Sequence, residues 1–285
     1  QWRQAVEPLE TPAEHGMTRD MVARDVLKRY REQYQAVFGT LPSMDNWPFF
    51  ASPLLGGELA DNWNQAPEKA QVEINTVFAN IGKALAAYQR TLMPVENRVD
   101  RFFAARLKGK TPAPQDQLSD AEIEGFKLFT GKAKCDNCHS GPLFTDHFFH
   151  NTGVPIANME RPDYGRAPAV LFLKQDIFTC DGDYSDAAKD ECRELEFMSD
   201  DPAVFEGSFK TPGLRGIAAR APYMHAGQIE TLEAVVEHYV ASPDPFFDLP
   251  ELDGTVSPHG EHTEAPEIEL NEEEKANLVA FLKAL

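Results

Sequence analysis

The five residues from Cys135 to His139, Cys-Asp-Asn-Cys-His, carry the clearest chemistry in this sequence. Two cysteines three positions apart lie on one side of a helical turn, where each sulfur can form a thioether with a vinyl group of a haem. The histidine that follows then lies under the porphyrin, where an imidazole nitrogen can bind the iron. The spacing therefore predicts a covalent haem, attached through Cys135 and Cys138, with His139 as the proximal iron ligand.

Two other uses of paired cysteines fit the sequence less well. A zinc site would need two more ligands at close spacing, but the other cysteines, Cys180 and Cys192, lie far downstream and 12 positions apart. A thioredoxin-type redox pair would follow a hydrophobic strand, whereas residues 119–134 have the pattern of a helix. Zinc binding and dithiol chemistry therefore stay as the weaker alternatives.

The remaining cysteines and the charge bear on compartment and partners. Haem is attached to cysteines outside the cytoplasm, where Cys180 and Cys192 can form a disulfide across an acidic loop. We therefore expect a periplasmic protein. The formal charge of -19 argues against nucleic acid and favours a basic protein partner, or solubility alone. No run approaches the roughly 20 apolar residues that span a bilayer, and no leader opens the chain, so its start at Gln1 is expected to be processed or truncated.

The elements that position the haem motif are predicted to be helices separated by long irregular loops. Ser119 and Glu122 form a capping pair for a helix that ends at Gly131, just ahead of the motif. Asn271 and Glu274 form a second capping pair, for the last helix of the chain. Helices before and after the motif are expected to pack together and close the haem pocket. The fold class is therefore predicted to be mainly α, with cytochrome c-like helical haem domains.

The first part of the chain predicts further helices. Residues 1–17 are broken by prolines and are expected to be irregular. Apolar residues at three- and four-residue steps predict one helix over 18–38, a second that begins after Pro67, and a third over 95–107. Residues 109–117 contain two prolines and little that could anchor them in a core, so we expect the domain boundary there, with domains at 1–112 and 113–285.

The sixth ligand of the iron has four candidates: Met224, His225, His238 and Tyr239. On a helix expected to begin near Thr231, Tyr239 shares a face with Leu232 and Val236, whereas His238 is turned about 100° away. Helical geometry therefore favours Tyr239. A buried core tyrosine with a satisfied hydroxyl is the alternative interpretation of the same position.

Five segments together resemble the bacterial di-haem cytochrome c peroxidases, and more closely their MauG-like branch. The segments are Gly131 to His139, Gly141 to Asp146, Phe149 to Val154, Phe209 to Arg215 and Ala221 to His225. Members of that family carry two c-type haems in two cytochrome-like domains, with a calcium ion between them. Peroxide reacts at the first haem, and the second transfers electrons. The resemblance implies that 1–112 is the remainder of the first, peroxidatic domain and that 113–285 is the C-terminal haem domain.

The resemblance also assigns residues. In the family a glutamine and a glutamate ten residues later lie over the first haem, which implies that Gln4 and Glu14 form the peroxide pocket and that Glu14 moves protons. The attachment site of that haem would lie upstream of Gln1, for example on a separate N-terminal segment. Backbone carbonyls matching Arg220 and Pro222 would bind the calcium ion.

The family's sixth ligand lies fourteen residues after the histidine of a Pro-Tyr-x-His segment, which from His225 is Tyr239. A tyrosine oxygen favours the ferric and higher states of iron. The resemblance thus predicts a periplasmic oxidoreductase that uses hydrogen peroxide and oxidises a substrate or a redox partner protein. Two alternatives stay open: a mono-haem electron-transfer cytochrome, and a peroxidase that takes electrons from a small redox protein.

Overall fold

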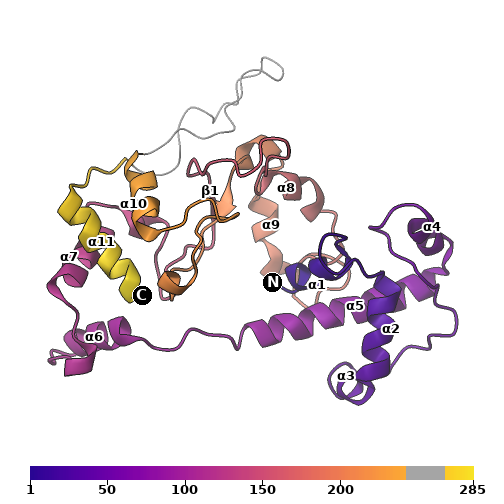
Figure 1. Cartoon of the computed structure of the whole chain (residues 1–285). Helices are drawn as coiled ribbons and strands as arrows, with labels where there is room; N and C mark the ends of the chain where they lie inside the picture. The colour runs from indigo at the N-terminus through magenta and orange to yellow at the C-terminus, as the bar shows by residue number, and fades with distance from the viewer. Residues whose placement is uncertain (242–266) are drawn as a thin grey trace. The chain divides into compact units, whose positions relative to one another are not determined.

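The computed structural model describes residues 1–241 and 267–285. These residues are mainly helical (Figure 1), which confirms the predicted fold class. The strands β1 (Phe149–His150) and β2 (Phe209–Lys210) are short and pair antiparallel, with Phe149 opposite Lys210. Among the described residues, no helix combines the length and the apolar character needed to cross a bilayer.

The described chain packs as two compact units. The first contains residues 1–93 and 173–198, and the second contains residues 94–172 and 199–285. The boundary expected near residue 112 lies inside the second unit. Arg101 contributes to this difference, because its Nε lies 2.7 Å from Asp116 Oδ1 and so ties the helix before residue 112 to the chain after it.

The helices of the first unit come from both of its segments. They are α1 (Trp2–Glu10), α2 (Arg19–Arg29), α3 (Arg31–Phe38), α4 (Glu58–Gln65), α5 (Glu68–Gln89), the 3-10 helix η3 (Lys189–Cys192) and α9 (Glu194–Phe197). The predicted start of α5 after Pro67 is confirmed. The single helix expected over 18–38 is two helices, because the backbone leaves helical geometry at Tyr30 (φ -122°, ψ 32°).

The expectation that residues 1–17 are irregular is wrong, because they contain α1. Pro8 lies inside this helix, where it removes the hydrogen bond that an N–H at this position would donate to the carbonyl oxygen of Gln4. Val6 is buried, and α1 packs closely on α5: a Cβ atom added at Gly82 would lie 2.6 Å from the carbonyl oxygen of Trp2. Packing of an apolar face stabilises a short helix that its sequence alone would not.

A buried polar network holds the first unit together. Nε and Nη2 of Arg19 donate to Glu10 Oε2, at 2.9 and 2.7 Å, and Ser52 Oγ donates to Glu10 Oε1 at 2.5 Å. Arg19 Nη1 donates to Asn75 Oδ1 at 2.8 Å, and its guanidinium lies 4.9 Å from the ring centre of Phe178. The network therefore joins α1, α2 and α5 to the returning segment 173–198.

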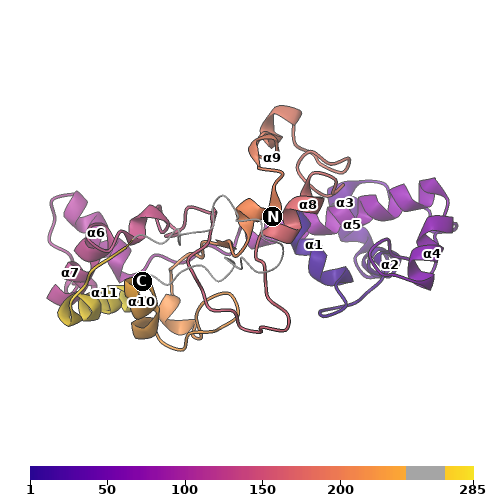
Figure 2. The same cartoon turned by 90° about the horizontal axis from the view of Figure 1, so that it is seen from above.

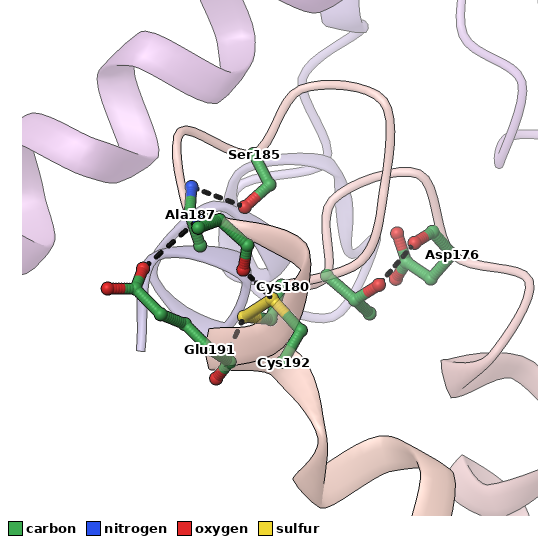
Figure 3. Close-up of a disulfide and its surroundings, with 8 residues drawn as sticks. Asp176, Cys180, Ser185, Ala187, Glu191 and Cys192 are labelled. Atoms are coloured by element: carbon green, nitrogen blue, oxygen red, sulfur yellow. Dashed lines mark hydrogen bonds between the residues drawn. A yellow bond between two sulfur atoms is a disulfide. The ribbon is translucent and has the colours of Figure 1, made fainter.

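Cys180 and Cys192 form the predicted disulfide, which closes a loop in this returning segment (Figure 3). Within the loop the backbone N–H of Ala187 donates to Ser185 Oγ at 3.2 Å. Lys83 Nζ on α5, outside the loop, lies 2.7 Å from Oδ2 of Asp186, which is within it. The loop is thus closed covalently and also tied to a helix of its own unit.

The second unit contains the haem motif. Its helices are α6 (Arg98–Leu107), η1 (Pro114–Asp116), α7 (Asp120–Phe129), η2 (Cys135–Asn137), α8 (Ala167–Leu173), η4 (Pro202–Phe205), η5 (Ile217–Ala219), α10 (Leu232–Ala241) and α11 (Glu272–Ala284). Residue 173, at the end of α8, already belongs to the first unit. Both predicted capping boxes form, at Ser119 with Glu122 and at Asn271 with Glu274.

The helices before and after the motif pack together as expected, since α7 and α11 lie side by side in both views (Figures 1 and 2). Their backbones approach at Gly125, where an added Cβ atom would clash with the carbonyl oxygen of Asn277. Glycine is needed there because the helices cross at that point. Phe129 and Phe281 are fully buried in the interface, with ring centres 5.4 Å apart.

Candidate haem site

The Cys-x-x-Cys-His motif forms a tight turn directly after α7. Lys134 adopts a left-handed conformation (φ 52°) and the 3-10 helix η2 follows it. The backbone N–H groups of Cys138 and His139 both donate to the carbonyl oxygen of Cys135, at 3.3 and 2.8 Å. The turn therefore fixes both cysteines and the histidine relative to one another.

The two cysteines do not form a disulfide with each other. Burial, the largest cause, raises the pKa of the Cys135 thiol to about 12. Reactive redox cysteines have a lowered pKa instead. The environment of Cys135 thus argues against dithiol chemistry and fits a sulfur that lies in an apolar haem pocket.

His139 is held in one orientation by its ring nitrogen Nδ1, which lies 2.9 Å from the carbonyl oxygen of Phe144. Nδ1–H donates to this oxygen, so Nε2 carries the lone pair that can bind iron. Burial lowers the pKa of His139, opposed by the backbone carbonyls of Phe144 and Pro212 and by the charge of Asp146. The imidazole is therefore neutral at pH 7, as an iron ligand requires.

The four candidates for the sixth ligand lie in different surroundings. Tyr239, on α10, is half-buried, and its pKa is raised by burial first and then by Cys135 and Cys138, while a hydrogen bond with Thr152 lowers it. Tyr239 also packs against the hydrophobic cluster that Cys135 contacts. His238 Nε2 lies 2.9 Å from the carbonyl oxygen of Thr152.

The other two candidates lie on the turn before α10. Met224 is half-buried in a left-handed conformation (φ 69°). His225 is exposed, and its ring stacks on Phe209 with centres 3.5 Å apart. Gln228 Nε2 lies 3.2 Å from His225 Nε2, so a side chain already occupies the neighbourhood of that nitrogen.

Aromatic side chains pack together beside the motif. The ring centre of Phe144 lies 5.9 Å from that of Phe129 and 6.5 Å from that of Phe281. Cys135 packs against the same hydrophobic cluster. Apolar walls, two thiols outside any disulfide and one oriented neutral imidazole are together the set that a c-type haem needs, so the residues present fit the group.

A second polar cluster adjoins the motif and was not predicted from the sequence. His150 Nε2 lies 2.7 Å from Asp146 Oδ2, and donor atoms of Cys138, Asp146 and His150 lie within 4.8 Å of one another. Such a triad can hold a metal ion, but thioether formation would engage Cys138. The four-residue spacing of Asp146 and His150 was the only sequence signal for this pair.

The residues assigned to the peroxide pocket lie in the first unit. Gln4 is exposed on α1, and Glu14 is exposed in the turn that follows α1. The backbone N–H of Glu14 donates to the carbonyl oxygen of Thr11 at 3.0 Å. Buried Glu10, which anchors α1, lies between them in sequence but was not singled out, because a single glutamate gives no signal of burial. Gln4 and Glu14 are thus placed on a packed helix and its turn.

The residues assigned to calcium lie in the second unit, and both are exposed. Nη2 of Arg220 donates to the carbonyl oxygens of Gly213 and Arg215, at 2.6 and 2.9 Å. Pro222 follows a cis peptide bond. The Arg220 side chain is therefore turned to its own loop.

Comparison with known proteins finds relatives of this chain. The family described as di-haem cytochrome c peroxidase matches residues 1–108. The chain is 34% identical over 209 residues to the cytochrome-c peroxidase IdrP1 of Denitromonas iodatirespirans, covering 71% of this chain and 48% of that protein. It is 31% identical over 206 residues to the methylamine utilization protein MauG of Methylorubrum extorquens, covering 72% and 44%. The chain spans about half the length of these relatives.

The fold has a counterpart of known structure. The diheme peroxidase BthA from Burkholderia thailandensis matches 100% of this chain and 63% of its own, with a TM-score of 0.59 and 19% identity. The helical fold and the Cys-x-x-Cys-His site define a protein of the cytochrome c type. With the sequence relatives, they identify the family: the chain belongs to the di-haem cytochrome c peroxidase and MauG family.

Proposed function

We propose that the second unit binds one haem c through Cys135 and Cys138, with the iron between His139 and Tyr239. The hydrogen bond from His139 Nδ1 to the carbonyl oxygen of Phe144 is the observation that carries this proposal, because it leaves the lone pair on Nε2 of a buried, neutral imidazole. The packing of Tyr239 against the same hydrophobic cluster as Cys135 supports the sixth ligand. The bound haem supplies one-electron redox chemistry.

The unit acts in a periplasmic di-haem peroxidase of the MauG type. Hydrogen peroxide would be reduced at another haem of the protein, over which Gln4 and Glu14 would lie. Gln4 binds peroxide there through its amide, and the Glu14 carboxylate transfers the proton between the peroxide oxygens. His139 would hold the haem of this unit, which would supply one-electron transfer from the partner protein or substrate that is oxidised. Backbone carbonyls of Arg220 and Pro222 contribute to a calcium site, since calcium takes carbonyl oxygens as ligands.

A tyrosine rather than a methionine at position 239 favours this function over its alternatives. Thioether ligation raises the haem potential and suits a peroxidase that accepts electrons from a small redox protein, whereas a phenol oxygen stabilises the ferric iron. A mono-haem electron carrier without catalysis is the other alternative. Rapid mixing of the haem-loaded protein with peroxide distinguishes it, because a pure carrier shows no fast spectral change.

Mass spectrometry tests the haem attachment. The protein is produced with the periplasmic haem-attachment machinery and extracted with acidic acetone, which removes haem that is not covalently bound. We expect the mass of the chain to retain one haem at Cys135 and Cys138, and to lose it in a Cys135→Ala/Cys138→Ala variant. Loss of all haem from the unsubstituted protein would contradict the proposal.

Kinetics test the peroxide pocket. Glu14→Gln in the protein that carries both haems is expected to lower peroxide turnover by about 10²-fold or more, the usual contribution of a general acid–base group. Glu7→Gln is the matched control, because Glu7 is also an exposed glutamate and lies on α1. Equal turnover in the two variants would remove Glu14 from the mechanism.

A further inference from the structure

We propose that Arg215 is a positioning residue for the proximal ligand. It clamps the loop 141–144 and thereby fixes the hydrogen bond between His139 Nδ1 and the carbonyl oxygen of Phe144. This inference rests on the proposed role of His139 as an iron ligand. It adds a residue, remote in sequence from the motif, that tunes the haem without touching it.

The guanidinium of Arg215 binds Asp100 through two of its nitrogens and the loop 141–144 through the third. Nη1 and Nη2 form a fork on Asp100, at 2.7 Å to Oδ2 and 2.8 Å to Oδ1. Nε donates to the carbonyl oxygen of Pro142 at 2.5 Å. The guanidinium carbon also lies 5.6 Å from the ring centre of Phe144. One side chain therefore connects a helix end to both Pro142 and Phe144 in the loop.

Asp100 is a rigid anchor for this clamp. It is the acid of the capping box of α6, where its Oδ2 accepts the backbone N–H of Asn97 at 2.9 Å and its own N–H donates to Asn97 Oδ1 at 3.1 Å. Only 16% of the Arg215 side chain and 25% of the Asp100 side chain are exposed. The pair is thus sheltered on a capped helix, a better support than the loop alone provides.

The clamp acts at the residue that orients the imidazole. The loop is held on its other side by the N–H of Leu214, which donates to the carbonyl oxygen of Leu143 at 3.3 Å. Phe144, between these contacts and the motif, then presents its carbonyl oxygen to His139. A hydrogen bond of this kind makes the imidazole a stronger donor to the metal. A looser loop weakens the bond, lowers that donation and so raises the reduction potential of the haem.

The chain offers a matched control in Arg98. Arg98 also forms a fork on the acid of a capping box, Glu122 of α7, and its Nη1 donates to the carbonyl oxygen of Gln117 at 3.1 Å. These bonds join α6 to α7 and not to the loop 141–144. Arg215→Lys and Arg98→Lys therefore remove the same kind of fork and keep the charge, but only the first releases the loop.

The experiment compares the reduction potential and the ferric EPR spectrum of the haem-loaded protein and both variants. We expect Arg215→Lys to raise the potential and shift the EPR g values, while Arg98→Lys leaves both unchanged. Unchanged values in Arg215→Lys, or equal shifts in the two variants, would overturn the positioning role. If Arg215→Lys does not fold, Asp100→Asn takes its place with the same expected shift.

The same measurements separate this inference from the proposed function. If the unsubstituted protein lacks the EPR signal of a histidine-ligated ferric haem, His139 is not a ligand and the proposed function itself fails. If that signal is present and insensitive to Arg215→Lys, His139 remains the ligand and only the role of Arg215 is wrong.

Discussion

His238 Nε2 lies 2.9 Å from the carbonyl oxygen of Thr152, while the neighbouring Tyr239 has its pKa raised by burial and by the haem-attachment cysteines. The two rings meet edge-on, with centres 5.3 Å apart. A nitrogen engaged by a backbone carbonyl is poorly placed to bind iron. The two adjacent residues of α10 therefore have different roles: His238 ties the helix to the segment at Thr152, and Tyr239 is the candidate ligand.

Replacement of Tyr239 tests this division. Tyr239→Phe is expected to open the sixth position to small ligands and to change the ferric optical and EPR spectra, and Tyr239→Met to raise the reduction potential. His238→Gln is the control, because glutamine can still donate to the Thr152 carbonyl oxygen, and its spectra should match those of the unsubstituted protein. If Tyr239→Phe leaves the spectra unchanged, the assignment is wrong and Met224 is the next residue to replace.

Features with local signals were predictable from the sequence. The capping boxes at Ser119 and Asn271 depend on residues three positions apart, and both form. The disulfide between Cys180 and Cys192 followed from a count of cysteines and from the compartment. Such features need no knowledge of the tertiary fold.

Features that depend on distant parts of the chain were not predictable. α1 forms in spite of Pro8 because its apolar face meets α5, more than sixty residues later. The clamp of Arg215 on Asp100 spans 115 positions, and no spacing rule links the two residues. Glu10, which pairs with Arg19, lay in a segment whose helix was not expected. Tertiary packing, rather than local propensity, decided all three.

The stability of the second unit should fall at acid pH in part through Asp100. The hydrogen bond with Arg215, the largest cause, lowers the pKa of Asp100 below its usual 3.8. A lowered pKa in the folded state stabilises the fold above the unfolded pKa, and this contribution is lost as the pH falls through the folded value. Asp100→Asn should therefore destabilise the unit at pH 7 but have less effect below about pH 3.8.

Denaturant unfolding between pH 7 and pH 3, followed by haem absorbance, measures this difference. Lys127→Met is a control at an exposed ion pair, with Glu124, where little pH dependence of the difference is expected. A stability difference between Asp100→Asn and the unsubstituted protein that stays constant down to pH 3 would contradict the argument.

Reduction of the Cys180–Cys192 disulfide should destabilise the first unit. The bond closes a loop with a sequence separation of 12, and cross-links of that length contribute about 2–3 kcal/mol, mainly by restricting the unfolded chain. The thermal midpoint of the unit should fall in a Cys180→Ser/Cys192→Ser variant. The addition of reductant should lower the thermal midpoint of the unsubstituted protein but not that of the double variant. Peptide mapping without reductant that finds both cysteines as free thiols would refute the bond.

The buried pair of Glu10 and Arg19 should be critical to the stability of the first unit. Their side chains are only 2% and 4% exposed, so the loss of one leaves the other charged in a medium that solvates it poorly. Glu10→Ala is therefore expected to destabilise the unit by about 3–5 kcal/mol. Glu7→Ala, an exposed change on the same helix, should stay within about 0.5 kcal/mol of the unsubstituted protein.

A double substitution shows whether the cost comes from the charge left behind. Glu10→Met/Arg19→Met removes both charges and keeps apolar volume near Phe178, so it should recover part of the stability that Glu10→Ala loses. Urea unfolding followed by tryptophan fluorescence reports on this unit, since Trp2, Trp47 and Trp63 all lie in it. If the double variant is as unstable as the sum of its single substitutions, the two residues act independently and Glu10 does not serve as the partner of a buried charge.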